Sequence, residues 1–129
     1  MVNCFNIYMI NQKINIGITG GTGTLGKILI KKLKQKNYKL FLYRSDIRNF
    51  RSIKKWIINN KLDVIFHLAS VVSVKNCNQN PLVTCSTNIG GTINILNSLR
   101  FSKKKIWFFY ASTSHVYKIK KKPLTEKDP

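Results

Sequence analysis

Acidic side chains are scarce in this chain, which carries only Asp46, Asp63, Glu126 and Asp128 against 23 lysines and arginines. The formal net charge of +19 is a balance found in many proteins that bind polyanions. The lysines are nevertheless scattered over expected helix surfaces, and no nucleic-acid motif or aromatic–basic platform accompanies them. Lys, Asn and Ile are abundant together, as in an AT-rich coding sequence. We therefore expect no specific nucleic-acid partner. A charge-driven binder of nucleic acid or of a membrane surface is a weaker hypothesis than the two other functions considered below.

Cysteines and long apolar runs are also few. Cys4, Cys77 and Cys85 form neither an even set nor a C-x-x-C pair, which argues against a disulfide framework and against a metal site. Free thiols favour a reducing compartment, so we expect a cytoplasmic protein. No apolar run approaches the roughly 18 residues of a membrane-spanning helix, so no membrane partner is expected. Residues 1–12 make a poor signal peptide and are interpreted as an N-terminal tail before one domain at 13–129.

A glycine-rich turn is the most informative stretch of the sequence. Ile14, Ile16 and Ile18 alternate as in a buried strand. Three glycines follow at the spacing G-x-x-G-x-x-G, and an apolar stripe at helical spacing comes next: Gly20, Gly23 and Gly26, then Leu25, Ile28, Leu29 and Leu33. Strand, glycine turn and helix in this order are typical of a nucleotide-binding site. The alternative, a glycine-rich loop without function, is less well supported by that context.

Each glycine has its own expected role. Gly20 permits a tight turn out of the strand, Gly23 lets a pyrophosphate approach the backbone, and Gly26 lets the helix lie close to the strand. The unpaired N–H groups at the helix start then face the phosphates, aided by the helix dipole. The stretch therefore predicts a dinucleotide-binding turn.

The end of the second expected strand, residues 39–43, bears on the choice of cofactor. In dinucleotide-binding folds, an acidic residue about 20 positions beyond the glycines binds the ribose of NAD, whereas an arginine accommodates the 2′-phosphate of NADP. Arg44 lies 18 residues after Gly26 and is followed by Ser45. This favours NADP, while Asp46, which could reach the ribose, keeps NAD open.

Strands and helices alternate along the remaining chain. Expected strands at 14–19, 39–43, 62–68 and 106–110 are separated by helices, of which 49–60 and 88–101 are the clearest, with a polar connection at 75–87. This alternation predicts an α/β fold with a doubly wound parallel sheet of Rossmann type, incomplete, with strand order 2-1-3-4 and helices on both faces. The expected buried helix faces are Phe50, Ile53, Trp56 and Ile57, and Ile89, Ile93, Leu96 and Leu99. His67 lies inside an apolar run and is interpreted as a core histidine.

Four segments carry a resemblance to a known family. Thr19–Gly26 fits T-G-x-x-G-x-x-G, Asp63–Ala69 resembles D-x-V-x-H-x-A, Asn88–Leu96 resembles N-x-x-G-T-x-N-x-L, and Ala111–Tyr117 resembles a strand-end segment with a catalytic hydroxyl. Together they resemble the extended short-chain dehydrogenases/reductases of the NAD-dependent epimerase/dehydratase family, over about residues 14–128. Members of that family mostly move a hydride between a carbon of a nucleotide-activated sugar and a nicotinamide.

The resemblance implies a set of site residues. Thr113 corresponds to the hydroxyl that holds the sugar oxygen, and Asn88 to a residue that approaches the dinucleotide from its helix. The other implied cofactor contacts are Thr24 and Leu25 under the pyrophosphate, Asp46 and Ile47 beside the adenine, and Leu68, Ala69 and Ser70 along the dinucleotide.

Departures from the family pattern qualify the expected activity. The short passage from Arg44 to Asn49 resembles deoxy-sugar reductases more than 4-epimerases, and Ser114-His115 argues against a dehydratase. The catalytic Y-x-x-x-K pair has no counterpart, because Tyr117, which matches that spacing with Lys121, already fills another family position. We therefore expect the N-terminal, NAD(P)-binding part of a nucleotide-sugar epimerase or reductase, inactive alone. The alternative is a non-catalytic dinucleotide-binding module with a regulatory role.

Overall fold

A computed structural model describes residues 14–36, 38–113, 117, 118, 123 and 125. The expected N-terminal tail therefore lies outside the described residues, as does most of the segment beyond Thr113. The elements in chain order are β1 (Asn15–Thr19), α2 (Thr24–Gln35), β2 (Lys39–Leu42), α3 (Phe50–Asn59), β3 (Val64–His67), α4 (Val74–Gln79), α5 (Pro81–Cys85), the π-helical turn η1 (Ser86–Gly90), α6 (Gly91–Leu99) and β4 (Trp107–Tyr110). All four predicted strands are present within two residues of their expected ends.

The four strands form one parallel sheet in the order β2-β1-β3-β4, as the sequence predicts. Ile18 pairs in register with Leu42 on one side of β1 and with Phe66 on the other. Because all strands run in the same direction, their carboxyl ends meet at one edge of the sheet. The segments that follow β1, β2, β3 and β4 are thereby brought together at that edge.

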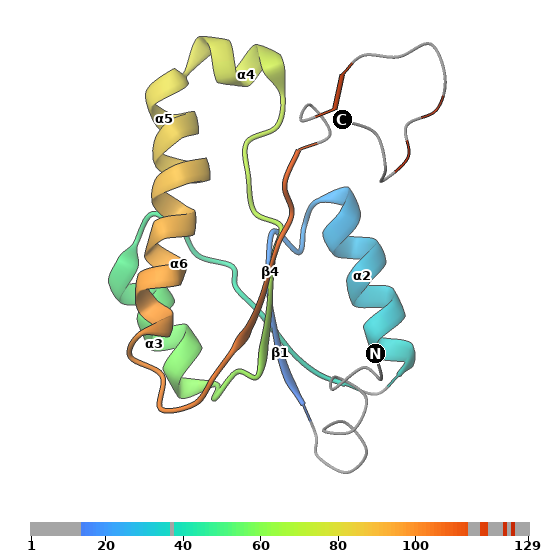
Figure 1. Cartoon of the computed structure of the whole chain (residues 1–129), viewed down its shortest axis with the longest axis vertical. Coiled ribbons are helices and arrows are strands. Elements are labelled where there is room, and N and C mark those ends of the chain that lie inside the picture. The colour runs from blue at the N-terminus through green and yellow to red at the C-terminus, as the bar shows by residue number, and fades with distance from the viewer. Residues whose placement is uncertain (1–13, 37, 114–116, 119–122, 124, 126–129) are drawn as a thin grey trace.

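Helices cover both faces of the sheet (Figure 1). Helix α2 lies on one face, where Leu29, Ile30 and Leu33 pack against a cluster formed by Ile14, Ile16, Ile18 and Val64. Helices α3 and α6 lie together on the other face. The predicted α/β class with helices on both faces is confirmed.

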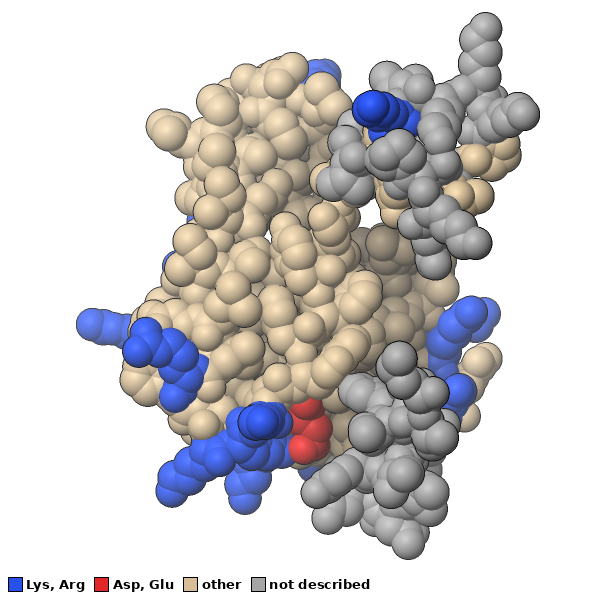
Figure 2. All heavy atoms as spheres, viewed as in Figure 1, with Lys and Arg blue, Asp and Glu red and all other residues tan. Residues whose placement is uncertain are grey.

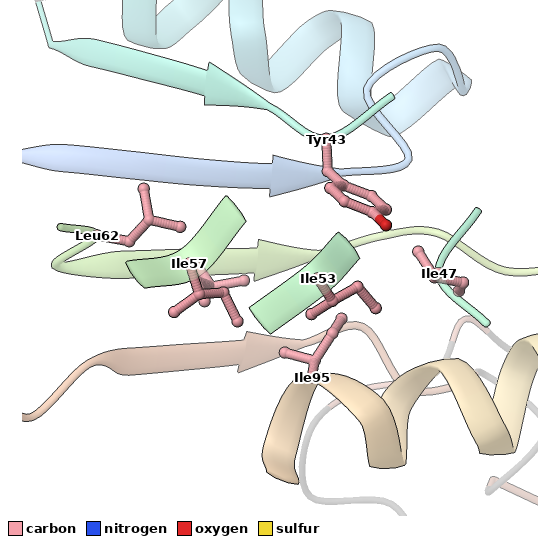
Figure 3. Close-up of a cluster of buried hydrophobic side chains, with 7 residues drawn as sticks. Tyr43, Ile47, Ile53, Ile57, Leu62 and Ile95 are labelled. Carbon is pink, nitrogen blue, oxygen red and sulfur yellow. The ribbon is translucent and has the colours of Figure 1, made fainter. Parts of the chain in front are cut away.

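The cluster on the α3 and α6 face is the larger core (Figure 3). Ile53 and Ile57 of α3 and Ile95 of α6 are fully buried there against Ile65 of β3. Gly17 of β1 leaves room for this packing, since a Cβ at that position would run into Trp56 and Leu62. The buried face predicted for 49–60 is confirmed for Ile53 and Ile57.

The buried face predicted for 88–101 is wrong for three of its four residues, whereas Leu99 packs against the core. Ile89, Ile93 and Leu96 are 60%, 57% and 45% exposed, and α6 instead buries Gly91, Ile95 and Ser98. The reason is the close approach of α6 to Ile47, whose side chain occupies the space where a Cβ of Gly91 would lie. The helix therefore packs through the face that holds Gly91, Ile95 and Ser98. Periodicity identifies an apolar stripe but not which stripe a neighbour covers.

Two further expectations need correction. The stripe on α2 is shifted, because Leu25 and Ile28 are exposed and Ile30 packs in their place. The polar connection at 75–87 is largely helical and contains all of α4 but its first residue, α5 and the start of η1. Ser73 caps α4 by accepting a hydrogen bond from the backbone N–H of Asn76, and Pro81 begins α5.

Charge is unevenly distributed over the chain. The 24 residues Asn76–Leu99 contain no charged side chain, although the whole chain carries 27. On the face shown in Figure 2, Lys and Arg gather along the lower part and the flanks, and the area over α5 and α6 is free of them. Within the described residues, no helix is both long and apolar enough to cross a membrane.

Candidate functional site

The glycine turn between β1 and α2 is packed against the end of β3. Gly20 has a φ of 71°, in the left-handed region, and a Cβ there would lie 2.5 Å from the backbone N of Ala69. A Cβ at Gly26 would collide with the carbonyl oxygen of Gly20 and with Cα of Gly21. Gly20 and Gly26 are therefore required for the turn itself, one by its conformation and one by the close approach of α2.

Gly23 differs from the other two glycines. It has ordinary extended backbone angles, and a Cβ there would meet only the carbonyl oxygen of Gly20, at 3.4 Å. Gly23 is exposed and precedes the first turn of α2, which contains no acidic residue. Its backbone N–H donates to Gly20. The fold thus tolerates a side chain at position 23, and its bare surface faces solvent.

A cavity of about 710 Å³ opens beside this turn. Its lining joins the glycine turn, the end of β2 and the end of β3, and includes Gly20, Gly23, Arg44, Ser45, Asp46, Ile47, Leu68, Ala69 and Ser70. Nine predicted site residues are therefore brought to one hollow. Six residues outside the predicted site set also line it: Gly21, Thr22, Lys27, Leu42, Tyr43 and Thr87.

The charged groups of this cavity are not equivalent. The carboxylate of Asp46 accepts hydrogen bonds from the Arg48 backbone N–H at 2.8 Å and from its guanidinium Nε at 2.9 and 3.0 Å. These bonds hold the pKa of the Asp46 carboxyl below its usual value. Arg44 is exposed at the cavity wall. The cavity wall therefore carries a carboxylate that is already ion-paired with Arg48 and, separately, the guanidinium of Arg44.

A second cavity, of about 480 Å³, lies on the other side of the β3 end. It shares Leu68, Ala69 and Ser70 with the first, so the two form adjoining hollows across the carboxyl ends of β1 and β3. Asn88 and Thr113 line it, together with Tyr110, Ala111 and Ser112 after β4. The site predictions that line neither cavity are Thr24, Leu25 and Gly26.

His67 forms part of the wall of the second cavity but is almost fully buried, with 2% of its surface exposed. Its Nδ1 lies 2.6 Å from Thr19 Oγ1, and its Nε2 lies 3.0 Å from Thr92 Oγ1. The rings of Phe108 and Tyr110 pack beside it. The interpretation of His67 as a core histidine with satisfied nitrogens is confirmed. Burial lowers the pKa of its imidazole to about 4.

This pKa predicts a loss of stability in mild acid. Unfolded His67 takes up a proton near pH 6.5 and the folded form only near pH 4, so the unfolded state binds more protons between these values. The free energy of unfolding is therefore expected to fall as the pH drops, by about 2 kcal/mol between pH 7 and pH 5. Urea unfolding at pH 7, 6 and 5 measures it.

The matched variant for this prediction is His115→Gln, which removes the only other histidine of the chain. The same fall in that variant assigns the effect to His67. A free energy of unfolding that stays constant from pH 7 to pH 5 would contradict the burial of a neutral imidazole.

Comparison with known proteins places this arrangement in a family. The sequence profile of the family described as GDP-mannose 4,6 dehydratase matches residues 32–129. The chain belongs to this family. It is also 32% identical over 130 residues to a UDP-N-acetyl-alpha-D-glucosaminuronate decarboxylase from Bacillus cytotoxicus, a match that covers 86% of this chain and 40% of that protein. The resemblance to nucleotide-sugar epimerases and dehydratases is thereby confirmed.

Solved structures show the same fold. A UDP-glucose 4-epimerase from Stenotrophomonas maltophila with bound NAD aligns with a TM-score of 0.75 at 20% identity, covering 89% of this chain and 42% of that one. A dTDP-4-dehydrorhamnose reductase from Bacillus anthracis in complex with NADP aligns with a TM-score of 0.68 at 22% identity, covering 75% and 36%. The chain thus spans well under half the length of these relatives and corresponds to the N-terminal part of the family fold.

Proposed function

We propose that this chain is the dinucleotide-binding part of a nucleotide-sugar reductase or epimerase, and that it binds a nicotinamide dinucleotide across the two adjoining cavities. The observation that carries the proposal is the glycine turn. Gly20 and Gly26 are fixed by packing, whereas Gly23 is bare and tolerant of a side chain, as expected where a ligand rather than the fold requires glycine.

The described residues fit such a ligand. A pyrophosphate placed over the turn would meet the backbone N–H groups at the start of α2, and Lys27 in the cavity lining adds a cation. The buried side chain of Ile47 offers an apolar contact for an adenine. A bound nicotinamide would supply or accept the hydride, and the second cavity would hold the sugar.

NADP is favoured over NAD by the pairing of Asp46. A ribose diol is held best by a carboxylate whose oxygens are free to accept its hydroxyl hydrogens. The carboxylate of Asp46 already accepts the hydrogen bonds of Arg48. A 2′-phosphate needs cationic or hydroxyl donors, which Arg44 and Ser45 place at the cavity wall.

Arg44→Ala is therefore expected to weaken NADP⁺ binding about tenfold while changing the affinity for NAD⁺ by less than twofold. The reason is that only NADP carries the phosphate that the guanidinium would contact, and a tenfold loss corresponds to about 1.4 kcal/mol. Isothermal titration calorimetry with both nucleotides measures the two affinities.

Arg51→Ala is the control, because Arg51 is an exposed arginine of α3 outside the cavity lining. It changes the net charge equally and should leave both affinities unaltered. A wild-type protein that binds NAD⁺ more tightly than NADP⁺ would contradict the cofactor preference while leaving dinucleotide binding intact.

Thr113 is the proposed contact for the reacting sugar. It is exposed in the second cavity, where its hydroxyl can donate to or accept from a sugar oxygen. The isolated 129-residue chain offers no tyrosine–lysine pair in the family position to take up the hydroxyl proton. We therefore expect dinucleotide binding without turnover, and NADPH oxidation by this chain with a nucleotide-4-ketosugar would contradict that part of the proposal.

A further inference from the structure

A chain of hydrogen bonds runs beneath the shared wall of the two cavities. The backbone N–H of Ala69 donates to Thr19 Oγ1 at 3.3 Å, and Thr19 Oγ1 lies 2.6 Å from His67 Nδ1. On the far side of the ring, His67 Nε2 contacts Thr92 Oγ1, which donates to the carbonyl oxygen of Asn88 at 2.7 Å. The chain thus connects β1, β3, α6 and η1.

The donors and acceptors fix the tautomer of His67. The Thr92 hydroxyl uses its hydrogen on the Asn88 carbonyl, so it accepts from His67, and Nε2 must carry a hydrogen. A neutral imidazole then has an unprotonated Nδ1, which accepts the Thr19 hydroxyl hydrogen. Thr19 Oγ1 is left as the acceptor for Ala69 N–H. Each donor hydrogen between Ala69 and Asn88 is thereby assigned to one acceptor.

The chain of hydrogen bonds ends at Asn88, whose side chain also holds the loop that follows β3. The Asn88 side chain accepts from the Val71 backbone N–H at 2.7 Å and donates to the Val71 carbonyl oxygen at 2.9 Å. Thr19 therefore holds the loop at Ala69, and Asn88 holds it at Val71. These two attachments are the clamps of the loop. These two points flank Ser70, which lines both cavities.

We propose that His67 is a positioning residue for the dinucleotide: through Thr19 and Thr92 it holds both clamps of the 68–71 loop, the wall shared by the two cavities. This inference rests on the proposed dinucleotide function. It adds a residue that acts on the bound dinucleotide through the 68–71 loop. Asn88, predicted as a direct cofactor contact, acts here through the loop, because its amide is engaged with Val71.

The test uses residues of the chain that line neither of these two cavities. Thr19→Val and Thr92→Val each remove one hydroxyl partner of His67 while keeping nearly the same shape. Thr19→Ser and Thr92→Ser restore the hydroxyls. Three readouts are compared: the affinity for NADP⁺, the hydrogen-exchange rates of the Ala69 and Val71 amides, and the ¹⁵N shifts of the His67 ring.

The expected result is a loss of NADP⁺ affinity of about tenfold in both valine variants, with recovery to within threefold in the serine variants. Exchange should accelerate at both Ala69 and Val71 in each valine variant, because the loss of one hydroxyl reaches the farther amide only through the His67 ring. The wild-type ring should show a protonated Nε2 and an unprotonated Nδ1. Ile57→Val, a core change in α3, controls for lost stability and should leave affinity and both exchange rates unchanged.

Two outcomes overturn the inference separately from the function. If wild-type protein binds NADP⁺ and both valine variants bind it equally well, His67 is a structural residue only. If the wild type binds no dinucleotide, the proposed function fails, and the exchange rates still decide whether the clamps depend on His67. A protonated Nδ1 contradicts the hydrogen-bond chain in either case.

Discussion

Gly26→Val is expected to leave the α/β domain unfolded. A Cβ at this position collides with backbone atoms of Gly20 and Gly21, and those atoms cannot retreat because Gly20 itself is pressed against Leu68 and Ala69. Overpacking of a core by side chains costs about 1–3 kcal/mol, and a branched side chain against fixed backbone costs more. Domains of this size are stable by only about 5–15 kcal/mol. Circular dichroism and the loss of a cooperative thermal transition measure the effect.

Gly90→Ala is the matched control for this prediction. Gly90 has helical backbone angles, and a Cβ there meets nothing within 4 Å. Alanine at such a site is expected to raise the free energy of unfolding by about 0.5–1 kcal/mol. A Gly26→Val protein that unfolds at the wild-type temperature would show that α2 does not pack on the turn as described.

Gly23→Ala is expected to fold normally and to bind dinucleotide about a hundredfold more weakly. The added methyl group makes only an ordinary contact with Gly20, so stability is kept. The same methyl stands where the pyrophosphate must approach the backbone, and a hundredfold loss corresponds to about 2.8 kcal/mol. Calorimetric titration with NADP⁺, beside a thermal melt of the same sample, separates binding from folding.

Gly90→Ala again serves as the control, now for affinity, because it adds the same methyl group outside both adjoining cavities. It should bind NADP⁺ as the wild type does. If Gly23→Ala and the wild type bind equally tightly, the pyrophosphate does not lie on the turn.

The sequence was sufficient to predict the sheet and the cluster of site residues. The alternation of apolar strands with helical periods predicts a parallel sheet, and connection rules favour the order β2-β1-β3-β4, which the structure has. Because the strands are parallel, their carboxyl ends lie at one edge of the sheet, and in this order the strands β2, β1 and β3 bring Gly20, Arg44 and Ala69 to one cavity. His67 was predictable as a core residue because apolar residues flank it in the strand.

Side-chain pairings and helix faces were not predictable in this way. The carboxylate of Asp46 is engaged by Arg48, two residues away, and no periodic pattern encodes that contact. Helix α6 offers two candidate faces, and the buried one holds Ile95 and places Gly91 against Ile47, a fit that periodicity does not encode. Asn88 was identified by family resemblance as a cofactor contact, yet its engagement with Val71 depends on the π-helical turn η1, which the sequence pattern does not reveal.

The most direct test of dinucleotide binding is a titration of ¹⁵N-labelled protein with NADP⁺, followed through the backbone amide resonances. We expect the shifts to concentrate in three segments that are distant in sequence and line the cavity together: residues 20–23, 44–47 and 68–70. Saturable shifts in all three segments, with little change on the exposed face of α6, would support the site. Shifts spread over the surface lysines, or no shifts at millimolar nucleotide, would contradict it.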